Sequence, residues 1–128
     1  MVLGFKKQFK QPILDEVKIH TIRLDANNRW TVGRLIHFAT GVRTKEYNCF
    51  KKGTCCRVQT IEFKWSKKKD HNGLFVKVFI DGKDVNSDVL NRLAIGDGFK
   101  DVHEFFEWEG WNGKDFKGKI IHWTSRQY

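Results

Sequence analysis

The sequence predicts an α+β fold, a small and mostly antiparallel β-barrel with short flanking helices. Three observations lead to this prediction. Several short segments of alternating apolar and polar residues are separated by turn signals, as in antiparallel strands. Two helical segments with capping residues come late in the chain, and a last apolar strand follows them. The chain has 128 residues and no internal repeat or linker, so one domain over residues 1–128 is expected.

The first part of the chain is expected to hold one helix and two strands. Apolar residues recur at every fourth position between Phe5 and Val17, which predicts a short amphipathic helix within residues 5–17. Pro12 is the only proline. Because proline lacks an amide hydrogen, the helix should begin near Gln11 or kink there. The segments with strand alternation that follow are 18–24 and 31–40, and a polar loop is expected over 41–48.

The middle of the chain has the clearest strand pattern, over residues 54–65. Its apolar parity changes partway, which indicates a bulge or a bend at a corner of the barrel. A hairpin tip is expected over 66–73, followed by a strand over 74–80. The dipeptide Asp81-Gly82 is a turn signal of the hairpin type.

Two helices and a strand are expected at the end of the chain. Ser87 is predicted as the N-cap of the first helix, and Asp101 as the N-cap of a second helix that reaches Trp108. Short polar side chains at these positions can accept hydrogen bonds from the otherwise unpaired amides of the first helical turn. The last strand is predicted over residues 116–124.

Composition limits the classes of function. The formal net charge is +9, from 24 Lys and Arg against 15 Asp and Glu, which makes a polyanion such as nucleic acid an expected partner. The alternative is a basic protein with no role on nucleic acid. Three cysteines without paired spacing argue against a secreted disulfide scaffold, and no apolar run approaches the length of a membrane span. A cytoplasmic location, no metal and no membrane partner are expected; the oligomeric state stays open.

The segment from Lys18 to Arg23 has the most suggestive chemistry. If it is a strand, Thr21 and Arg23 share one face, and Lys18 lies opposite unless a loop or bulge holds it. A hydroxyl beside a lysine and a guanidinium offers a nucleophile, a base and an anion holder. The alternative is an ordinary solvated strand.

The order of short motifs resembles a known family. Lys18-x-x-Thr21-Ile22-Arg23 is followed far downstream by Asp97-Gly98-Phe99 and by a closing Ile-Ile-His-Trp strand. From about residue 9 to residue 123 this layout is similar to the ASCH domain family, within the PUA-like superfamily. The resemblance implies a PUA-like β-barrel with flanking short helices and no cofactor.

The same resemblance implies two classes of activity. Small bacterial acetylcytidine amidohydrolases of this family carry the motif Lys-Thr-x-Thr-Ile-Arg and a catalytic lysine, threonine and glutamate. Carried over, Lys18, Thr21 and Asp97 would be catalytic, and Arg23 would match the arginine of the motif. His20 precedes the threonine, and aspartate stands where the family has glutamate. Other members look like RNA-binding modules, and the fold alone does not choose between these activities.

Three interpretations of this cleft are therefore carried forward. The favoured one is binding of RNA or a modified nucleoside between Lys18, Thr21, Arg23 and Asp97, with His20 beside them. The second is hydrolysis of an N-acylated cytidine, which needs burial or the Arg23 cation to lower the pKa of Lys18 so that it can act as a base. The third is a non-catalytic accessory or scaffold protein, in which these charges form a structural ion-pair network.

Basic and aromatic residues elsewhere suggest further contacts with a nucleic acid. Lys67, Lys68 and Lys69 lie next to Trp65 in the sequence, which suits phosphate contact together with base stacking. Trp108 and Trp111, on either side of Gly110, could line a pocket for a planar base. The alternatives are a solvated hairpin tip for the lysines and a core position for the tryptophans.

Overall fold

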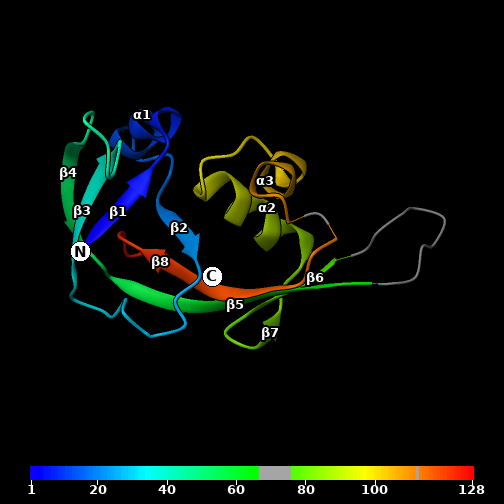
Figure 1. Cartoon of the computed structure of the whole chain (residues 1–128). Coiled ribbons are helices and arrows are strands. Elements are labelled where there is room, and N and C mark those ends of the chain that lie inside the picture. The colour runs from blue at the N-terminus through cyan, green and yellow to red at the C-terminus, as the bar shows by residue number, and fades with distance from the viewer. Residues whose placement is uncertain (67–75, 112) are drawn as a thin grey trace.

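The chain folds into two β-sheets and three short helices with one helical turn before them, in a computed structural model that describes residues 1–66, 76–111 and 113–128 (Figure 1). The fold is α+β, and its sheets are mostly antiparallel. No helix in these described ranges is both long enough and apolar enough to span a membrane. In chain order the elements are β1 (Val2–Phe5), η1 (Lys7–Phe9), α1 (Lys10–Leu14), β2 (His20–Arg23), β3 (Leu35–Thr40), β4 (Asn48–Thr54), β5 (Arg57–Trp65), β6 (Val76–Ile80), β7 (Lys83–Asp84), α2 (Ser87–Gly96), α3 (Val102–Glu109) and β8 (Phe116–His122).

The strands form a three-stranded and a five-stranded sheet. The smaller sheet has the order β1-β3-β4, in which β1 runs parallel to β3, and β3 is antiparallel to β4. The larger sheet has the order β2-β8-β5-β6-β7, and all its pairs are antiparallel. No ladder of hydrogen bonds closes the two sheets into a barrel within the part of the chain that the structure describes.

The chain passes from one sheet to the other at Cys55 and Cys56. The Cys55 amide donates to the Arg34 carbonyl beside β3, whereas the Cys56 amide donates to the His122 carbonyl at the end of β8, both at 2.8 Å. Cys55 is buried and Cys56 is exposed. The strand predicted over 54–65 is therefore present as β5, and the corner at Cys55 and Cys56 separates it from Thr54, the last residue of β4. The register of β5 with β8 has no shift from Arg57 to Phe63, so the bend lies at the start of the predicted segment and not partway along it.

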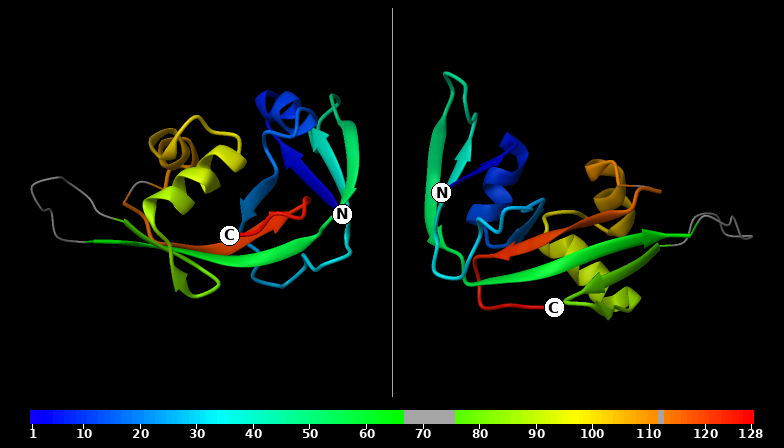
Figure 2. Two further views of the ribbon diagram at one scale, coloured as in Figure 1. Left: turned by 180° about the vertical axis from the view of Figure 1, so that it is seen from behind. Right: turned by 60° about the horizontal axis from the view of Figure 1, so that its bottom comes forward.

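The helices α2 and α3 pack over one face of the five-stranded sheet (Figure 2). They enclose a core rich in aromatic rings, in which Phe63 of β5 lies 6.1 Å from Phe105 and 5.1 Å from Phe106, centroid to centroid. The burial of rings of this size contributes much of the hydrophobic stabilisation in a small domain. The largest side chains with almost no exposure include Phe38, Phe63, Phe105, Ile13, Ile36, Ile61, Leu93, Ile120 and Ile121.

The N-terminal helix is shorter than the sequence predicted, and a strand and a turn precede it. In place of one helix over residues 5–17, the structure has the strand β1, the turn η1 and the short helix α1. Phe5, Phe9 and Ile13 are all buried, and each lies in a different element. Their four-residue spacing therefore does not come from a single helix. Val17 is 52% exposed and lies beyond α1. Pro12 sits in the first turn of α1, which begins at Lys10, so the expected start near Gln11 is confirmed.

Several other boundaries also differ from the sequence prediction. The strand predicted from Lys18 begins at His20, the strand predicted from Thr31 begins at Leu35, and the last strand ends at His122. The strand β4 was not expected, because its residues show little alternation of buried and exposed positions. Asp101 is confirmed as the N-cap of α3. The N-cap of α2 is Asn86 and not Ser87, since Asn86 Oδ1 accepts from the Val89 amide at 2.9 Å.

Candidate functional site

Three of the predicted residues, Lys18, Thr21 and Arg23, line one cavity of about 250 Å³. Lys18 reaches it because it precedes β2, so strand alternation does not fix the direction of its side chain. Its amide donates to the Pro12 carbonyl at 3.0 Å, in the turn that follows α1. The cavity is lined by Gly4, Phe5, Lys6, Phe9, Lys18, Thr21, Ile22, Arg23 and Trp108.

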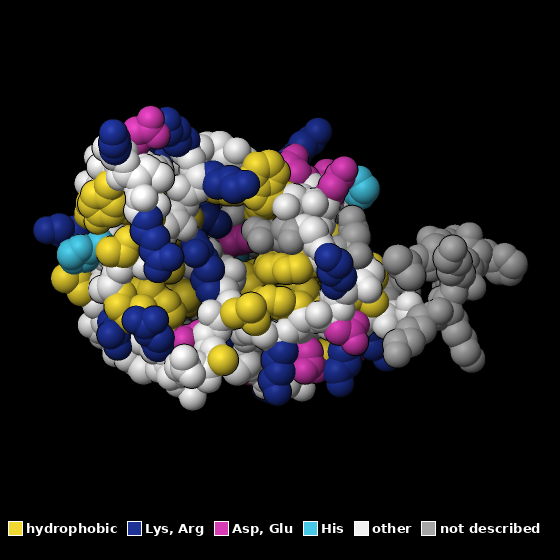
Figure 3. All heavy atoms as spheres, viewed as in Figure 1, with side chains coloured by type: hydrophobic (Ala, Val, Ile, Leu, Met, Phe, Trp, Pro, Cys, Tyr) yellow, Lys and Arg dark blue, Asp and Glu magenta, His cyan; other side chains and the backbone are white. Residues whose placement is uncertain are grey.

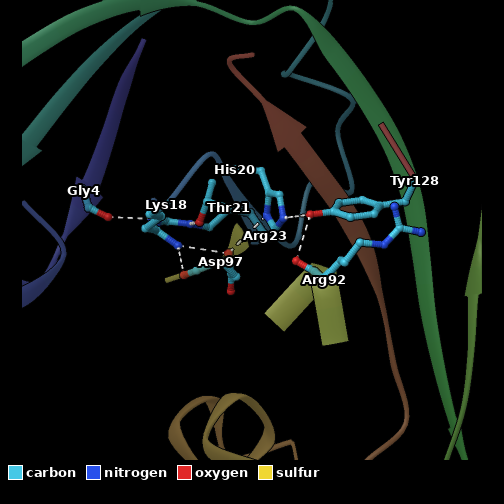
Figure 4. A network of polar contacts seen from close by, with 8 residues as sticks. All are labelled: Gly4, Lys18, His20, Thr21, Arg23, Arg92, Asp97 and Tyr128. Atoms are coloured by element: carbon cyan, nitrogen blue, oxygen red, sulfur yellow. Dashed lines mark hydrogen bonds and ion pairs between the residues drawn. The ribbon is translucent and has the colours of Figure 1, made fainter. Parts of the chain in front are cut away.

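Asp97 holds Lys18 from behind this cavity. Lys18 Nζ donates to the Asp97 carbonyl oxygen at 2.6 Å and to Asp97 Oδ1 at 2.9 Å, and both side chains are almost fully buried (Figure 4). Burial by itself raises the pKa of Asp97, but the Lys18 ammonium and a smaller contribution from His20 bring it below its ordinary value. Asp97 is therefore an ionised partner of Lys18 and does not line the cavity itself.

The motif Asp97-Gly98-Phe99 explains how Lys18 can approach so closely. Asp97 is the C-cap of α2, and Gly98 has a φ of +96°, a conformation that L side chains rarely adopt. A Cβ atom on Gly98 would lie 3.3 Å from Lys18 Cδ and 3.3 Å from Phe9 Cδ1. Phe99 packs edge-on against the Phe9 ring. Glycine at this position therefore leaves room for both Lys18 and Phe9.

Arg23 is fixed by contacts on two sides of its guanidinium. Its Nε donates to Thr21 Oγ1 at 3.1 Å, and its Nη2 donates to the Gly4 carbonyl of β1 at 2.6 Å. Its Cζ lies 5.2 Å from the centre of the Phe5 ring. Because Thr21 Oγ1 accepts from Arg23, the hydroxyl hydrogen of Thr21 can be donated to a ligand. The cavity wall thus combines a buried ammonium, a hydroxyl and an oriented guanidinium.

His20 lies on the other side of Asp97 and does not line this cavity. Its Nδ1 is 3.4 Å from Asp97 Oδ1, and its Nε2 is 2.8 Å from the Tyr128 hydroxyl. Burial lowers the pKa of His20 although Asp97 opposes the shift, so the ring is neutral at pH 7. Sequence reasoning placed His20 in the ligand site and did not anticipate Tyr128, which lies 108 positions away in the chain.

The other predicted ligand-binding residues lie elsewhere. Trp111 packs between core rings, 4.6 Å from Phe116, and Trp65 packs against Phe106 at 5.2 Å. Lys67, Lys68 and Lys69 fall outside the described residues. Besides Phe5 and Phe9, the cavity is lined by Trp108, which is 44% exposed, and Lys6 Nζ lies 5.2 Å from its ring centre. Trp108 was considered with Trp111 for such a pocket, whereas Lys6 was not predicted, since a lone lysine carries no pattern that relates it to Lys18.

Basic side chains gather around this region of the surface. Figure 3 shows Lys and Arg side chains over the half of the molecule formed by α1 and the three-stranded sheet, and along the hollow beside it. This face can attract an anion, because like charges around a concave surface focus the potential there.

In residues 1–66, 76–111 and 113–128, no group of three or more His, Cys, Asp and Glu side chains is arranged to hold a metal ion. Comparisons with protein-family models, curated proteins and solved structures find no protein that matches this chain.

Proposed function

We propose that this protein binds RNA or a modified nucleoside, with one base in the cavity formed by Lys18, Thr21 and Arg23. The observation that carries the proposal is the composition of the cavity wall, in which these three donors stand beside the Phe9 and Trp108 rings. Aromatic rings offer a stacking surface to any base, and cations beside them suit the phosphates that flank it.

The size of the cavity supports a single base as its occupant. Drug-sized ligands occupy pockets of about 300–1,000 Å³, and this cavity, at about 250 Å³, is smaller. The remainder of a strand would lie on the basic surface around the cavity, which is consistent with the net charge of +9. Lys6, at the rim beside Trp108, is positioned for a phosphate next to the bound base.

The contacts of Lys18 favour binding over catalysis. A general base needs a lone pair, whereas Lys18 Nζ donates hydrogen bonds to two oxygens of Asp97, one of them on an ionised carboxylate. Such a site stabilises the ammonium form. A buried ammonium beside a cavity can hold an anion or a carbonyl oxygen without any turnover.

We further propose an ASCH-type domain with a PUA-like barrel. The support is the juxtaposition of Lys18, Arg23 and Asp97-Gly98, which are far apart in the sequence and belong to the motifs of the resemblance. The strand β4 passes directly into β5 at the Cys55 corner, as in a sheet that bends toward closure.

Binding should depend on Arg23 and on salt. Wild-type protein should bind a fluorescent single-stranded RNA with an affinity that falls steeply as salt increases, because each neutralised phosphate releases counterions. Arg23→Gln should weaken binding about tenfold, since a charge-assisted hydrogen bond contributes about 1.5–3 kcal/mol. Fluorescence anisotropy between low and high salt measures both effects.

Arg34→Gln is the matched control, because it removes the same charge from an exposed position outside the cavity. A flat salt response of the wild type, or equal weakening by Arg34→Gln and Arg23→Gln, would contradict the proposal. Circular dichroism should show that both variants are folded.

A second function, amide hydrolysis, is favoured by one specific observation: Thr21 shares the cavity with Lys18, and Lys18 contacts a carboxylate. In this reaction the amide C–N bond of acetylcytidine breaks, water supplies a hydroxyl to the acetyl carbon to give acetic acid, and the other hydrogen of water restores the neutral amino group of cytidine.

The amidase hypothesis predicts that wild-type protein releases cytidine from acetylcytidine, measured by chromatography. Thr21→Val should abolish release, because it removes the hydroxyl at nearly constant volume. Thr40→Val is the control, since Thr40 is a buried threonine of β3 outside the cavity. No release by the wild type, or equal release by Lys18→Ala, would rule this function out.

A further inference from the structure

A second and larger cavity, of about 510 Å³, lies across the buried Lys18–Asp97 pair from the first. Lys18 lines the first cavity, whereas its chain neighbours Val17 and Ile19 line the second. The backbone of residues 17–19 is therefore the partition between the two. None of the residues that line the first cavity belongs to the second, so the second cavity can hold a ligand of its own.

Two arginines from different elements converge on this second cavity. Arg92 comes from α2, and Arg126 comes from the segment that follows β8. Neither guanidinium forms a hydrogen bond or an ion pair with any residue that the structure describes. Glu16 also lines the cavity, but in the described ranges its carboxylate lies in no ion pair with either arginine. These three side chains leave one net positive charge.

The rest of the wall provides hydrogen-bond donors and an apolar surface. Tyr128 and Gln127 bring a hydroxyl and an amide, while Val17, Ile19 and Ile95 bring apolar atoms. Burial, with a smaller contribution from Asp97, raises the pKa of Tyr128 to about 12, so its hydroxyl keeps its proton at neutral pH. The wall therefore offers two cations and several hydrogen-bond donors to an anion, beside the carboxylate of Glu16 and the acceptor oxygens of Gln127 and Tyr128.

We propose that this cavity binds a phosphate monoester of a small organic molecule. The guanidinium groups of Arg92 and Arg126 would hold the phosphate, since their planar N–H donors match its oxygens in pairs. The organic part would lie on Val17 and Ile95. Two like charges that face one concave surface without a counterion repel each other, and a bound dianion would remove this repulsion.

Polar contacts connect this cavity to Lys18 through buried side chains. His20 Nδ1 lies 3.4 Å from Asp97 Oδ1, and His20 Nε2 lies 2.8 Å from the Tyr128 hydroxyl, which also lies within 3.3 Å of the Arg92 carbonyl (Figure 4). The single hydrogen of that hydroxyl can serve only one of these two acceptors. A Cβ atom on Gly96 would lie 2.7 Å from that hydroxyl and 2.9 Å from His20 Nε2, so glycine permits the contact. A phosphate that accepts from the Tyr128 hydroxyl would change the contact between this hydroxyl and His20 Nε2, and His20 would report binding.

The test is calorimetric titration of the whole chain with ribose 5-phosphate, with ribose and inorganic phosphate as separate arms. Ribose 5-phosphate should bind saturably and ribose should not. The variant Arg92→Gln/Arg126→Gln should weaken binding about tenfold or more, because two charge-assisted contacts are lost. Arg29→Gln/Arg34→Gln removes the same charge from exposed positions outside the cavity and should bind as the wild type does. Arg23→Gln, in the first cavity, should also bind normally, which separates this site from the proposed nucleoside site.

Three results would overturn the assignment. The wild type would not bind ribose 5-phosphate saturably, or both double variants would weaken binding equally, or inorganic phosphate would bind as tightly as ribose 5-phosphate. A second measurement needs no variant: in nitrogen NMR of the imidazole rings, ribose 5-phosphate should shift the His20 signals. His103, which is exposed on α3, should not shift and is the internal control. Unchanged His20 signals at saturating ligand would also overturn the assignment.

Discussion

Replacing Asp97 by alanine should lower the free energy of unfolding by about 3–5 kcal/mol, the usual cost of removing one partner of a buried ion pair. The substitution takes the Asp97 carboxylate away from the Lys18 ammonium, which keeps its contact with the backbone carbonyl of residue 97, and away from His20 Nδ1. Both groups are buried, so water does not replace the lost contact at low cost. Urea unfolding followed by circular dichroism measures the effect.

Asp84→Ala is the matched control, because Asp84 is an exposed aspartate of β7, and its loss should change stability by less than about 0.5 kcal/mol. Lys18→Met should also lower the free energy of unfolding, since it leaves the Asp97 carboxylate buried without the Lys18 ammonium. The double variant Lys18→Met/Asp97→Ala should lose clearly less than the two single losses together, because it removes both charges. Two results would contradict this prediction: losses of the single variants that add up in the double variant, or an Asp97→Ala loss no larger than that of Asp84→Ala. Either would show that Lys18 and Asp97 do not stabilise each other.

The site could be predicted where the signal is local. Thr21 and Arg23 lie two positions apart in a strand, so alternation places them side by side, and the structure has them in direct contact. Lys18 joins them only because it precedes the strand, an option that the sequence left open. Asp97 lies 79 positions from Lys18, and no periodicity connects them. Their pairing was expected from the resemblance of short motifs, and physical reasoning on the sequence alone would not have found it.

Tertiary packing brings further residues to the site. Trp108 was one of two tryptophans considered for a pocket, and it lies at this one because α3 turns one face toward Phe99 and toward Phe9, which is distant in the sequence. Tyr128 meets His20 through the pairing of β2 with β8. Conversely, Trp111 looked like a ligand residue and instead packs against Phe116, because a bulky ring near several phenylalanines is buried more readily than exposed.

The fold shows the same division between local and distant signals. Asp101 was identified as an N-cap because capping depends on residues one turn apart, and the strand around Ile61 follows from alternation. The first strand, Val2–Phe5, was missed, since a parallel strand of four residues depends on its pairing with β3. A four-residue apolar spacing fits both a helix and a strand that leads into a helix, and only the pairing decides.

Acidification should destabilise the fold from about pH 6.5 downward through its buried histidines. Burial, with smaller contributions from the His20 and Arg57 charges, lowers the pKa of His122 from 6.5 to about 4. Between these values the unfolded chain binds a proton that the folded chain excludes, so the free energy of unfolding falls as pH falls. The total loss from His122 is about 3 kcal/mol, since each pKa unit corresponds to about 1.4 kcal/mol. The pKa of His20 is lowered too, so its contribution has the same sign.

Urea unfolding at several pH values between 7.5 and 4 measures this slope, and stability should be nearly independent of pH above 7 as far as these two groups determine it. His122→Gln should flatten the slope by about one proton, because an amide can still donate to Gln59 Oε1, as Nε2 does at 3.0 Å, but does not titrate. His103→Gln, at a position where the side chain is 84% exposed, should keep the full slope.

Below pH 4 a further loss of stability should come from Asp97, because its folded pKa lies below its ordinary value. Its ion pair with Lys18 is lost only as pH falls through that lower value. An unchanged slope in His122→Gln would mean that His122 is protonated without cost in the folded protein.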